Sequence, residues 1–442
     1  MRRDPLGFLL QVAREHEGVV DLGGLGSQRF FLVHQPEHVR YVLQLNNANY
    51  HKGTNFKEGK LLVGDGLIGV EGATWQRQRR LVQPAFHRPQ LAAMAHEMTE
   101  AIAVSLERWR PWVDTGQPVD LVEEMMRLTQ RVVLRTIFGS DSQIDQDVVI
   151  QEWGVARDFL NHRMWALLKA PIALPTPGNL RFRLALRRLD EVVYHIIRER
   201  RGQRTEGRVD MLSMLLGAVD AETSRGMSDL QVRDEVMTMF LAGYETTALA
   251  LSWLWGKLCE FPQVEQRVRQ EVEQELGERT PGVEDCARMR YGRMVLDEVL
   301  RLFPPVWIYG RTPREDDVIG GFRVPAGANL LLSPYVTQRN PTLWADPERF
   351  DPERFKPEAA AGRQRFAYFP FGGGQRQCIG DNFALLEMQL VLGMVLQRYQ
   401  LRLRPGTQLQ PEAQLTLRPR GGLWVTLHSR AAAPPTSTAA VN

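Results

Sequence analysis

The sequence predicts a mainly helical α+β fold, with one large helical body and small β-sheets at one side. From Trp75 to about residue 302, apolar residues recur at spacings of three and four, as in amphipathic helices. After residue 303, short strand-like runs alternate with turns rich in Gly and Pro. The 442 residues are 43% hydrophobic and 24% charged, which excludes disorder, collagen or coiled coil for the whole chain.

Each expected helix ends at a Pro, Gly or acidic break. The expected helices are 5–16, 91–110, 120–138, 181–201, 229–258, 263–276 and 382–397, and strand-like pieces occupy 29–33, 319–336 and 415–427. We therefore expect one domain over 1–428: a β-rich N-terminal part at about 1–70, a helical body at about 74–303, a β and irregular region at about 304–371, and a loop with the last helix at about 371–398. Residues 429–442 are rich in Ala, Pro and Thr, which predicts a disordered tail.

Charge and cysteine content exclude several classes of protein. With 55 basic and 52 acidic side chains the net charge is +3, so no global attraction to nucleic acid is expected. The cysteines Cys259, Cys286 and Cys378 cannot form a disulfide framework and lack zinc-like spacing. The N-terminus has too few apolar residues for a signal peptide or membrane anchor. We expect a soluble, cytoplasmic, monomeric protein that binds neither nucleic acid nor membrane.

The segment FPFGGGQRQCIGDNFALLE places Cys378 between a Gly-rich loop and a predicted helix. Glycines let the backbone pass close to a flat cofactor and aim N–H groups at sulfur, and a helix N-terminus favours an anion. Cys378 is therefore expected to be a thiolate, which suits haem iron; a buried structural cysteine is the alternative. The segment resembles the haem-binding loop of the cytochrome P450 superfamily at every fixed position: Phe371, Gly374, Arg376, Cys378 and Gly380.

This resemblance covers about residues 5–428 and implies the cytochrome P450 fold. It implies haem b as cofactor, dioxygen as co-substrate and Cys378 as the metal ligand, with Phe371, Gly372, Arg376 and Gly380 at the cofactor. The implied enzyme is a monooxygenase. It inserts one oxygen atom into a C–H bond or an alkene of an apolar substrate, with two electrons supplied from outside and water as the other product.

Glu298 and Arg301 lie one turn apart in DEVLRLFPP and can pair on one helix face. Alone, such a pair is typical of a solvated surface. Within the resemblance it matches the ExxR motif, which an Arg of a downstream PERF segment completes. DPERFDPERF offers Arg349 and Arg354, and the order along the chain favours Arg354. The implied triad fixes the loop under the haem and does no chemistry.

The segment FLAGYETTALALSW interrupts an otherwise apolar helix with polar residues, which is costly unless they serve a purpose. Thr side chains that bond back to carbonyls loosen a helix, so we expect a distorted turn that seats dioxygen and water; an ordinary polar seam is the alternative. AGYETT resembles the superfamily's oxygen-binding motif. By that resemblance Glu245 and Thr246 are catalytic: Glu245 relays protons, and Thr246 donates a hydrogen bond to oxygen and keeps water ordered.

Trp75 and Arg79 lie one helical turn apart in WQRQR, which resembles the WxxxR element of the superfamily. Its Trp and Arg contact a haem propionate, for which charge-assisted hydrogen bonds are apt. The resemblance also nominates Arg311 and Arg376 as propionate partners.

The substrate pocket is expected to be apolar and to select by shape. The resemblance carries this role by position to residues for which plain core packing is the alternative: Leu67, Ile68, Ala242, Val306, Trp307 and Leu417. LLSPYVTQRNP and TLRPRGGL resemble soluble bacterial members related to carotenoid and long-chain lipid hydroxylases. The expected substrate is therefore a carotenoid, terpenoid, fatty acid or similar lipid-like molecule.

Electrons are expected from separate proteins, because no GxGxxG follows a strand and no flavin or iron–sulfur segment follows the haem loop. A ferredoxin or flavodoxin, with its NAD(P)H reductase, is expected to dock near Cys378. Two alternatives stay open: a peroxide-driven peroxygenase on the same fold, and a non-catalytic haem-binding module. The intact Glu245 and Thr246 favour the monooxygenase over both.

Overall fold

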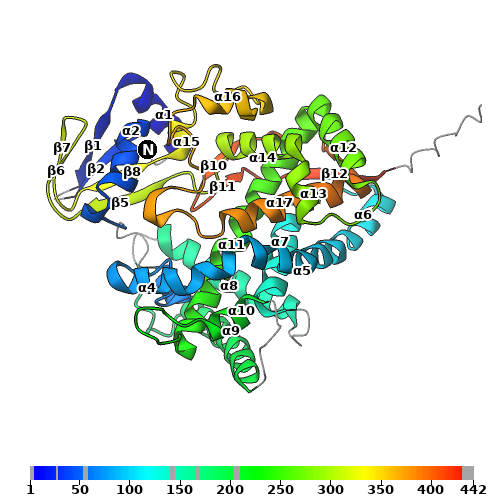
Figure 1. Ribbon diagram of the computed structural model, residues 1–442, viewed down its shortest axis with the longest axis horizontal. Coiled ribbons are helices and arrows are strands. Elements are labelled where there is room, and N and C mark those ends of the chain that lie inside the picture. Colours follow the sequence, from blue (N-terminus) through cyan, green and yellow to red (C-terminus); the bar gives the residue numbers. More distant parts are fainter. Residues whose placement is uncertain are drawn as a thin grey trace, which may run out of the picture.

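The computed structural model describes residues 4–25, 28–52, 58–139, 145–165, 169–202 and 210–430. Figure 1 shows β1 (Val19–Leu25) and β2 (Gln28–Val33) of the main sheet at one side of a much larger helical body, whereas β12 (Trp424–Ser429) lies toward the opposite side. The small sheets therefore do not all lie at one side, contrary to the sequence prediction. The helices of the first half are α1 (Pro5–Glu15), α2 (Pro36–Arg40), α3 (Lys60–Val63), α4 (Gly72–Val82), α5 (Arg88–Glu107), α6 (Arg110–Thr115), α7 (Leu121–Phe138), α8 (Gln146–Trp165), α9 (Pro177–Arg201) and α10 (Met211–Gly217). Those of the second half are α11 (Asp229–Glu260), α12 (Pro262–Leu276), α13 (Val283–Arg288), α14 (Arg290–Leu302), α15 (Pro334–Thr337), α16 (Pro357–Ala361) and α17 (Asp381–Arg398).

The main sheet has the strand order β1-β2-β8-β5-β3, in which β2 and β8 are parallel and the other pairs antiparallel. Its strands are β1 (Val19–Leu25), β2 (Gln28–Val33), β3 (Tyr50–His51), β5 (Tyr309–Pro313) and β8 (Asn329–Leu332). A second sheet has the order β4-β12-β9, and two hairpins stand apart. These strands are β4 (Val119–Asp120), β6 (Asp317–Ile319), β7 (Phe322–Val324), β9 (Tyr399–Leu403), β10 (Pro411–Ala413), β11 (Leu417–Pro419) and β12 (Trp424–Ser429).

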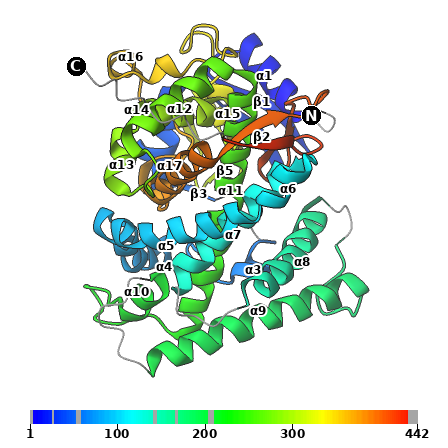
Figure 2. The same ribbon diagram turned by 90° about the vertical axis from the view of Figure 1, so that its right-hand side faces the viewer.

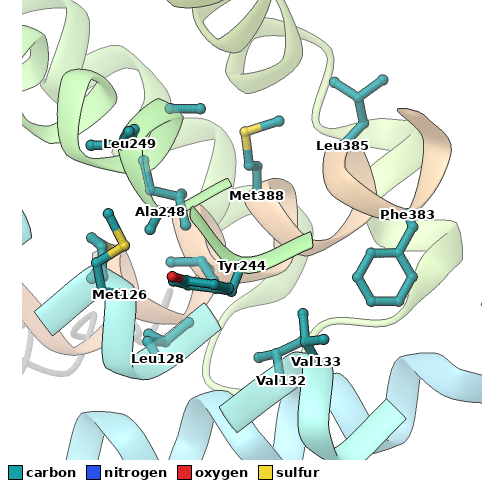
Figure 3. Packing of buried hydrophobic residues seen from close by; sticks show 14 of the residues in the cluster. Met126, Leu128, Val132, Val133, Tyr244, Ala248, Leu249, Phe383, Leu385 and Met388 are labelled. Atoms are coloured by element: carbon teal, nitrogen blue, oxygen red, sulfur yellow. The ribbon is translucent and has the colours of Figure 1, made fainter. Parts of the chain in front are cut away.

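Helix α11 passes through the middle of the helical body and packs on α7, α14 and α17 (Figure 2). Ser228 begins it with a reciprocal capping box to Gln231, which satisfies backbone N–H groups that a helix start leaves unpaired. Apolar side chains of α7, α11 and α17 meet in one core, where Tyr244 lies against Met126 and Leu128 of α7 (Figure 3). This packing holds α11 beside the helix that follows Cys378.

The predicted helices and strand-like pieces are present, except that Pro334–Thr337, at the end of the predicted strand segment 319–336, forms helix α15. Two further corrections apply. The segment 146–165 was not among the expected helices, yet it forms α8. Its buried Val149 and Trp153 alternate with exposed Val148 and Val155, so no single apolar stripe marks the helix in sequence. The predicted tail began too early, because Ser429 still pairs with Tyr399 in the β12–β9 ladder; residues 431–442 lie outside the described residues.

Within the described part of the chain, none of the helices is both long and apolar enough to cross a membrane.

Candidate functional site

Cys378 lies in the loop that leads into α17, three residues before that helix begins. The backbone N–H of Cys378 donates to the carbonyl of Phe371 at 3.0 Å, and the N–H of Gly380 is directed at the sulfur. Gly372 and Gly374 have left-handed φ angles of +72° and +69°. At Gly374 a Cβ would also collide with the backbone carbonyl of Leu43. The loop therefore requires glycine at this point.

The thiol of Cys378 is exposed, although the surrounding protein desolvates it strongly. Burial raises the pKa of Cys378 to about 11, against the opposing effect of the Gly380 N–H. Without a coordinated metal ion, these effects of the protein favour the neutral thiol. Ionisation of Cys378 at neutral pH requires a bound cation, and a metal ion deprotonates a coordinating thiol.

Three arginines converge near this loop. Arg79 on α4 donates to the carbonyl of Gln377 at 3.0 Å and attracts a thiolate at Cys378. Burial lowers the pKa of Arg376 to about 10; Glu71 opposes this effect, whereas the half-buried Arg311 on β5 and Arg79 add to it. Arg79 and Arg311 make no ion pair with a carboxylate among the described residues. Half-buried guanidinium groups without an ion-paired carboxylate fit the propionate groups of haem.

Glu71 and Lys52 lie beside these arginines and were not predicted as site residues. The carboxylate of Glu71 forms an ion pair with the guanidinium of Arg376 at 2.8 Å. It also accepts a hydrogen bond from the backbone N–H of Lys52 at 3.0 Å. The ammonium of Lys52 donates to the carbonyl of Ile68 at 2.5 Å, and burial, then Arg376, lowers the pKa of Lys52 to about 7. Only the position of Glu71 just before α4 hinted at a role, since acidic residues are typical of helix starts.

The buried Glu298 and Arg301 face each other on α14 in a two-point ion pair, with N···O distances of 2.6 and 2.9 Å. Arg354 lies 3.6 Å from Glu298, whereas Arg349 contributes only its carbonyl, which accepts from Arg301 at 3.2 Å. The backbone N–H of Asp351 adds a bond to Glu298 at 2.8 Å. Arg301 thus ties α14 to the irregular segment that precedes the cysteine loop.

Helix α11 stays continuous through residues 242–247, so the predicted distortion does not interrupt it. The hydroxyls of Thr246 and Thr247 bond back to the carbonyls of Ala242 and Gly243, at 2.8 and 2.9 Å, as the sequence suggested. The carboxylate of Glu245 is buried and accepts a hydrogen bond of 2.7 Å from Thr416. Thr416 was not predicted, because within TLRPRGGL the resemblance carried a role only to the next residue, Leu417.

Arg157 of α8 supplies a positive charge that interacts with Glu245. Burial alone would lower the pKa of Arg157, but Tyr244, Asp158 and Glu245 raise it above its ordinary value. Arg157 was also missed, since its helix was not expected.

The residues nominated for the substrate pocket differ in their surroundings. Ala242 is exposed, and Ile68 and Val306 are half-buried. Leu67 is buried, and its backbone N–H donates to Glu235 at 3.1 Å. The Trp307 indole is tied to the carbonyl of Gln414 at 3.0 Å, and Leu417 has no exposed surface. Leu417 therefore packs as core, so the structure does not bring it to an open surface.

Fold and site together fit a haem-thiolate protein: a helical body presents the exposed Cys378 in a Gly-rich loop, close to arginines that make no ion pair with a carboxylate among the described residues. The chain belongs to the cytochrome P450 family, whose model matches residues 3–425. It is a monooxygenase that uses haem b and dioxygen to oxidise an apolar substrate.

The curated relatives include two enzymes of Streptomyces melanosporofaciens, both 39% identical. Cyclooctatin synthase aligns with 94% of this chain and 90% of its own, and cyclooctat-9-en-7-ol 5-monooxygenase with 92% and 87%. Pentalenene oxygenase of Streptomyces avermitilis is 32% identical, over 94% and 91%. Among solved structures, the haem domain of cytochrome P450DA has a TM-score of 0.85 at 27% identity, over 97% of this chain and 92% of its own.

Proposed function

We propose that this monooxygenase hydroxylates or epoxidises a terpenoid hydrocarbon or alcohol. The observation that supports this proposal is the similarity, along almost the whole chain, to enzymes named for cyclooctat-9-en-7-ol and pentalenene. The exposed or half-buried Ala242, Ile68 and Val306 are all apolar, which suits such a substrate.

In this proposal Cys378 is the iron ligand, and bound haem supplies the oxidising chemistry. Arg79, Arg311 and Arg376 hold the propionates, with Trp75 beneath Arg376. Glu298, Arg301 and Arg354 keep the cysteine loop in register with α14. Thr246 orders water at the reaction site, and Glu245 moves protons toward it.

Electrons are proposed to come from a ferredoxin or flavodoxin with its NAD(P)H reductase, docking near Cys378. We also propose a monomer that works in the cytoplasm.

The absorption spectrum of the purified protein tests the ligand. Reduced protein under carbon monoxide should show a strongly red-shifted Soret band, and Cys378→Ser should lose it. Cys286→Ser is the matched control, because burial raises the pKa of that thiol to about 12 and no glycine loop surrounds it. A normal band in Cys378→Ser would refute the assignment.

Titration with pentalenene, cyclooctat-9-en-7-ol, β-carotene and lauric acid tests the substrate class. A low-to-high-spin shift with the terpenoids alone supports the proposal, and a shift with only lauric acid or β-carotene contradicts it.

Thr246→Ala separates the possible modes of action. In a monooxygenase that uses Thr246 as proposed, it should uncouple NAD(P)H consumption from product and leave peroxide-driven turnover largely intact. Unchanged coupling would remove the role proposed for Thr246.

A further inference from the structure

The hairpin β10–β11 approaches the polar turn of α11. Thr416, in the turn between the two strands, donates its hydroxyl to Oε1 of Glu245 at 2.7 Å, and both side chains are buried. Among the described residues this hydroxyl is the one hydrogen-bond donor to Glu245, so Oε2 accepts none from them. A carboxylate held by one oxygen keeps the other available for a proton or a water molecule.

The turn that carries Thr416 is fixed on both sides. The indole of Trp307 donates to the carbonyl of Gln414 at 3.0 Å, and the N–H of Gln414 donates to the carbonyl of Thr416 at 3.1 Å. After Thr416, the N–H of Leu417 donates to the carbonyl of Pro305 at 2.9 Å. Because the turn is anchored in this way, the Thr416 hydroxyl is presented at a defined place.

Helix α11 also holds this turn directly. The indole of Trp253, two turns beyond Glu245 on the same helix, donates to the carbonyl of Leu417 at 3.1 Å. Two hydrogen bonds therefore join the hairpin to α11: the Trp253–Leu417 bond and the Thr416–Glu245 bond. A defined geometry of this kind is what a proton-transfer group needs.

We propose that Thr416 is a positioning residue for Glu245. Its hydroxyl fixes one carboxylate oxygen and thereby directs the other to the proton path, so the hairpin, together with α11, sets how efficiently electrons are converted into product. This inference rests on the proton-relay role proposed for Glu245. It adds a residue for which the sequence predicted no role.

The test compares Thr416→Val, which keeps the shape and removes the hydroxyl, with Thr416→Ser, which keeps the hydroxyl. Each holoenzyme is supplied with a ferredoxin and its NADPH-dependent reductase, and with pentalenene or cyclooctat-9-en-7-ol, whichever shifts the spin state. Product formed per NADPH should fall about tenfold in Thr416→Val and return to within about twofold in Thr416→Ser, since a hydrogen bond to a charged group is lost in the first alone. Substrate affinity from the spin-state titration should stay within about twofold.

Thr426→Val is the matched control, because the Thr426 hydroxyl faces His428 on β12 and not Glu245.

Adding Thr416→Val to Glu245→Gln separates this inference from the proposed function. If Glu245→Gln alone leaves coupling unchanged, the proposed relay fails. If Glu245→Gln uncouples and Thr416→Val does not, Thr416 has no positioning role. Equal uncoupling in the double variant and in Glu245→Gln supports the inference, whereas additive losses contradict it.

Thermal unfolding gives a readout that does not depend on turnover. Thr416→Val should lower the unfolding midpoint in the native background and leave it nearly unchanged in the Glu245→Ala background. An equal decrease in both backgrounds would show that Thr416 acts apart from Glu245 and would overturn the proposal.

Discussion

The guanidinium of Arg376 lies over the ring of Trp75, 3.9 Å from the ring centre. The two residues come from the cysteine loop and from α4, and the same guanidinium pairs with Glu71 at 2.8 Å. Stacking and ion pairing together fix the direction of Arg376 before any anion binds. The contact between Arg376 and Trp75 also holds α4 against the loop that carries Cys378.

Arg376→Leu should weaken haem binding. The variant removes a charge from a site where Arg79 and Arg311 have no carboxylate partner among the described residues, and it also removes the contact with Trp75. We expect haem affinity to fall by about tenfold or more, because a charge-assisted bond contributes ~1.5 kcal/mol or more. Transfer of haem to apomyoglobin measures the loss. Exposed Arg402→Leu is the control, and equal transfer rates in the two variants would contradict this role.

Glu298→Gln should destabilise the protein strongly. The substitution leaves the guanidinium of Arg301, which has no exposed surface, without its counter-charge, and breaking a buried ion pair costs about 3–5 kcal/mol. Denaturant unfolding followed by circular dichroism gives the free energy of unfolding.

The control for this pair is Arg110→Ala. Arg110 pairs with Glu107 at the same i, i+3 spacing, but both side chains are more than half exposed. Its loss should change the free energy of unfolding by about 0.5 kcal/mol or less. Similar losses for Glu298→Gln and Arg110→Ala would mean that burial does not strengthen the first pair.

The sequence supported both the fold class and the principal site motifs, because short-range patterns carry them. The spacing of Glu298 and Arg301 predicts a shared helix face, and the choice of Arg354 over Arg349 agrees with the 3.6 Å contact. The back-bonding of Thr246 likewise follows from one helical turn.

Contacts between distant segments were not predictable in the same way. Thr416 meets Glu245 across 171 residues, and Glu71 meets Arg376 across 305. Each depends on how hairpins and helices pack, which no local pattern records. The effect of burial on the pKa of Cys378 was not predictable either, because helix-terminus and N–H effects are local whereas desolvation comes from the whole fold.

Gly374→Ala should disturb the cysteine loop. Its φ of +69° disfavours a side chain, and the added Cβ would meet the backbone carbonyl of Leu43, which cannot move aside cheaply. We expect a loss of at least ~1–2 kcal/mol of stability and a reduced yield of protein with the red-shifted reduced-CO band. Gly362→Ala is the control, since open space surrounds Gly362 and its φ is −91°. Matching behaviour of the two variants would contradict the requirement for glycine at 374.

Glu235 on α11 should make stability depend on pH. Its Oε2 accepts the N–H of Leu67 at 3.1 Å, and its Oε1 is buried without a hydrogen-bond partner among the described residues. Burial, aided by Asp234, raises the pKa of Glu235 from 4.5 to about 7. The folded protein therefore keeps a proton on Glu235 that the unfolded chain releases above about pH 4.5.

Because the folded state binds more protons in this window, the contribution of Glu235 to stability is complete below about pH 4.5 and is lost as the pH rises to about 7. The slope is at most ~1.4 kcal/mol per pH unit, which gives roughly 3 kcal/mol across the window. Glu235→Gln keeps an acceptor for Leu67 but does not titrate, so its stability relative to the native protein should rise between pH 5 and 7 and stay constant above. Urea unfolding at each pH measures this difference, and exposed Glu15→Gln should follow the native protein throughout. A constant difference between Glu235→Gln and the native protein would mean that Glu235 is already ionised in the fold, in spite of its burial.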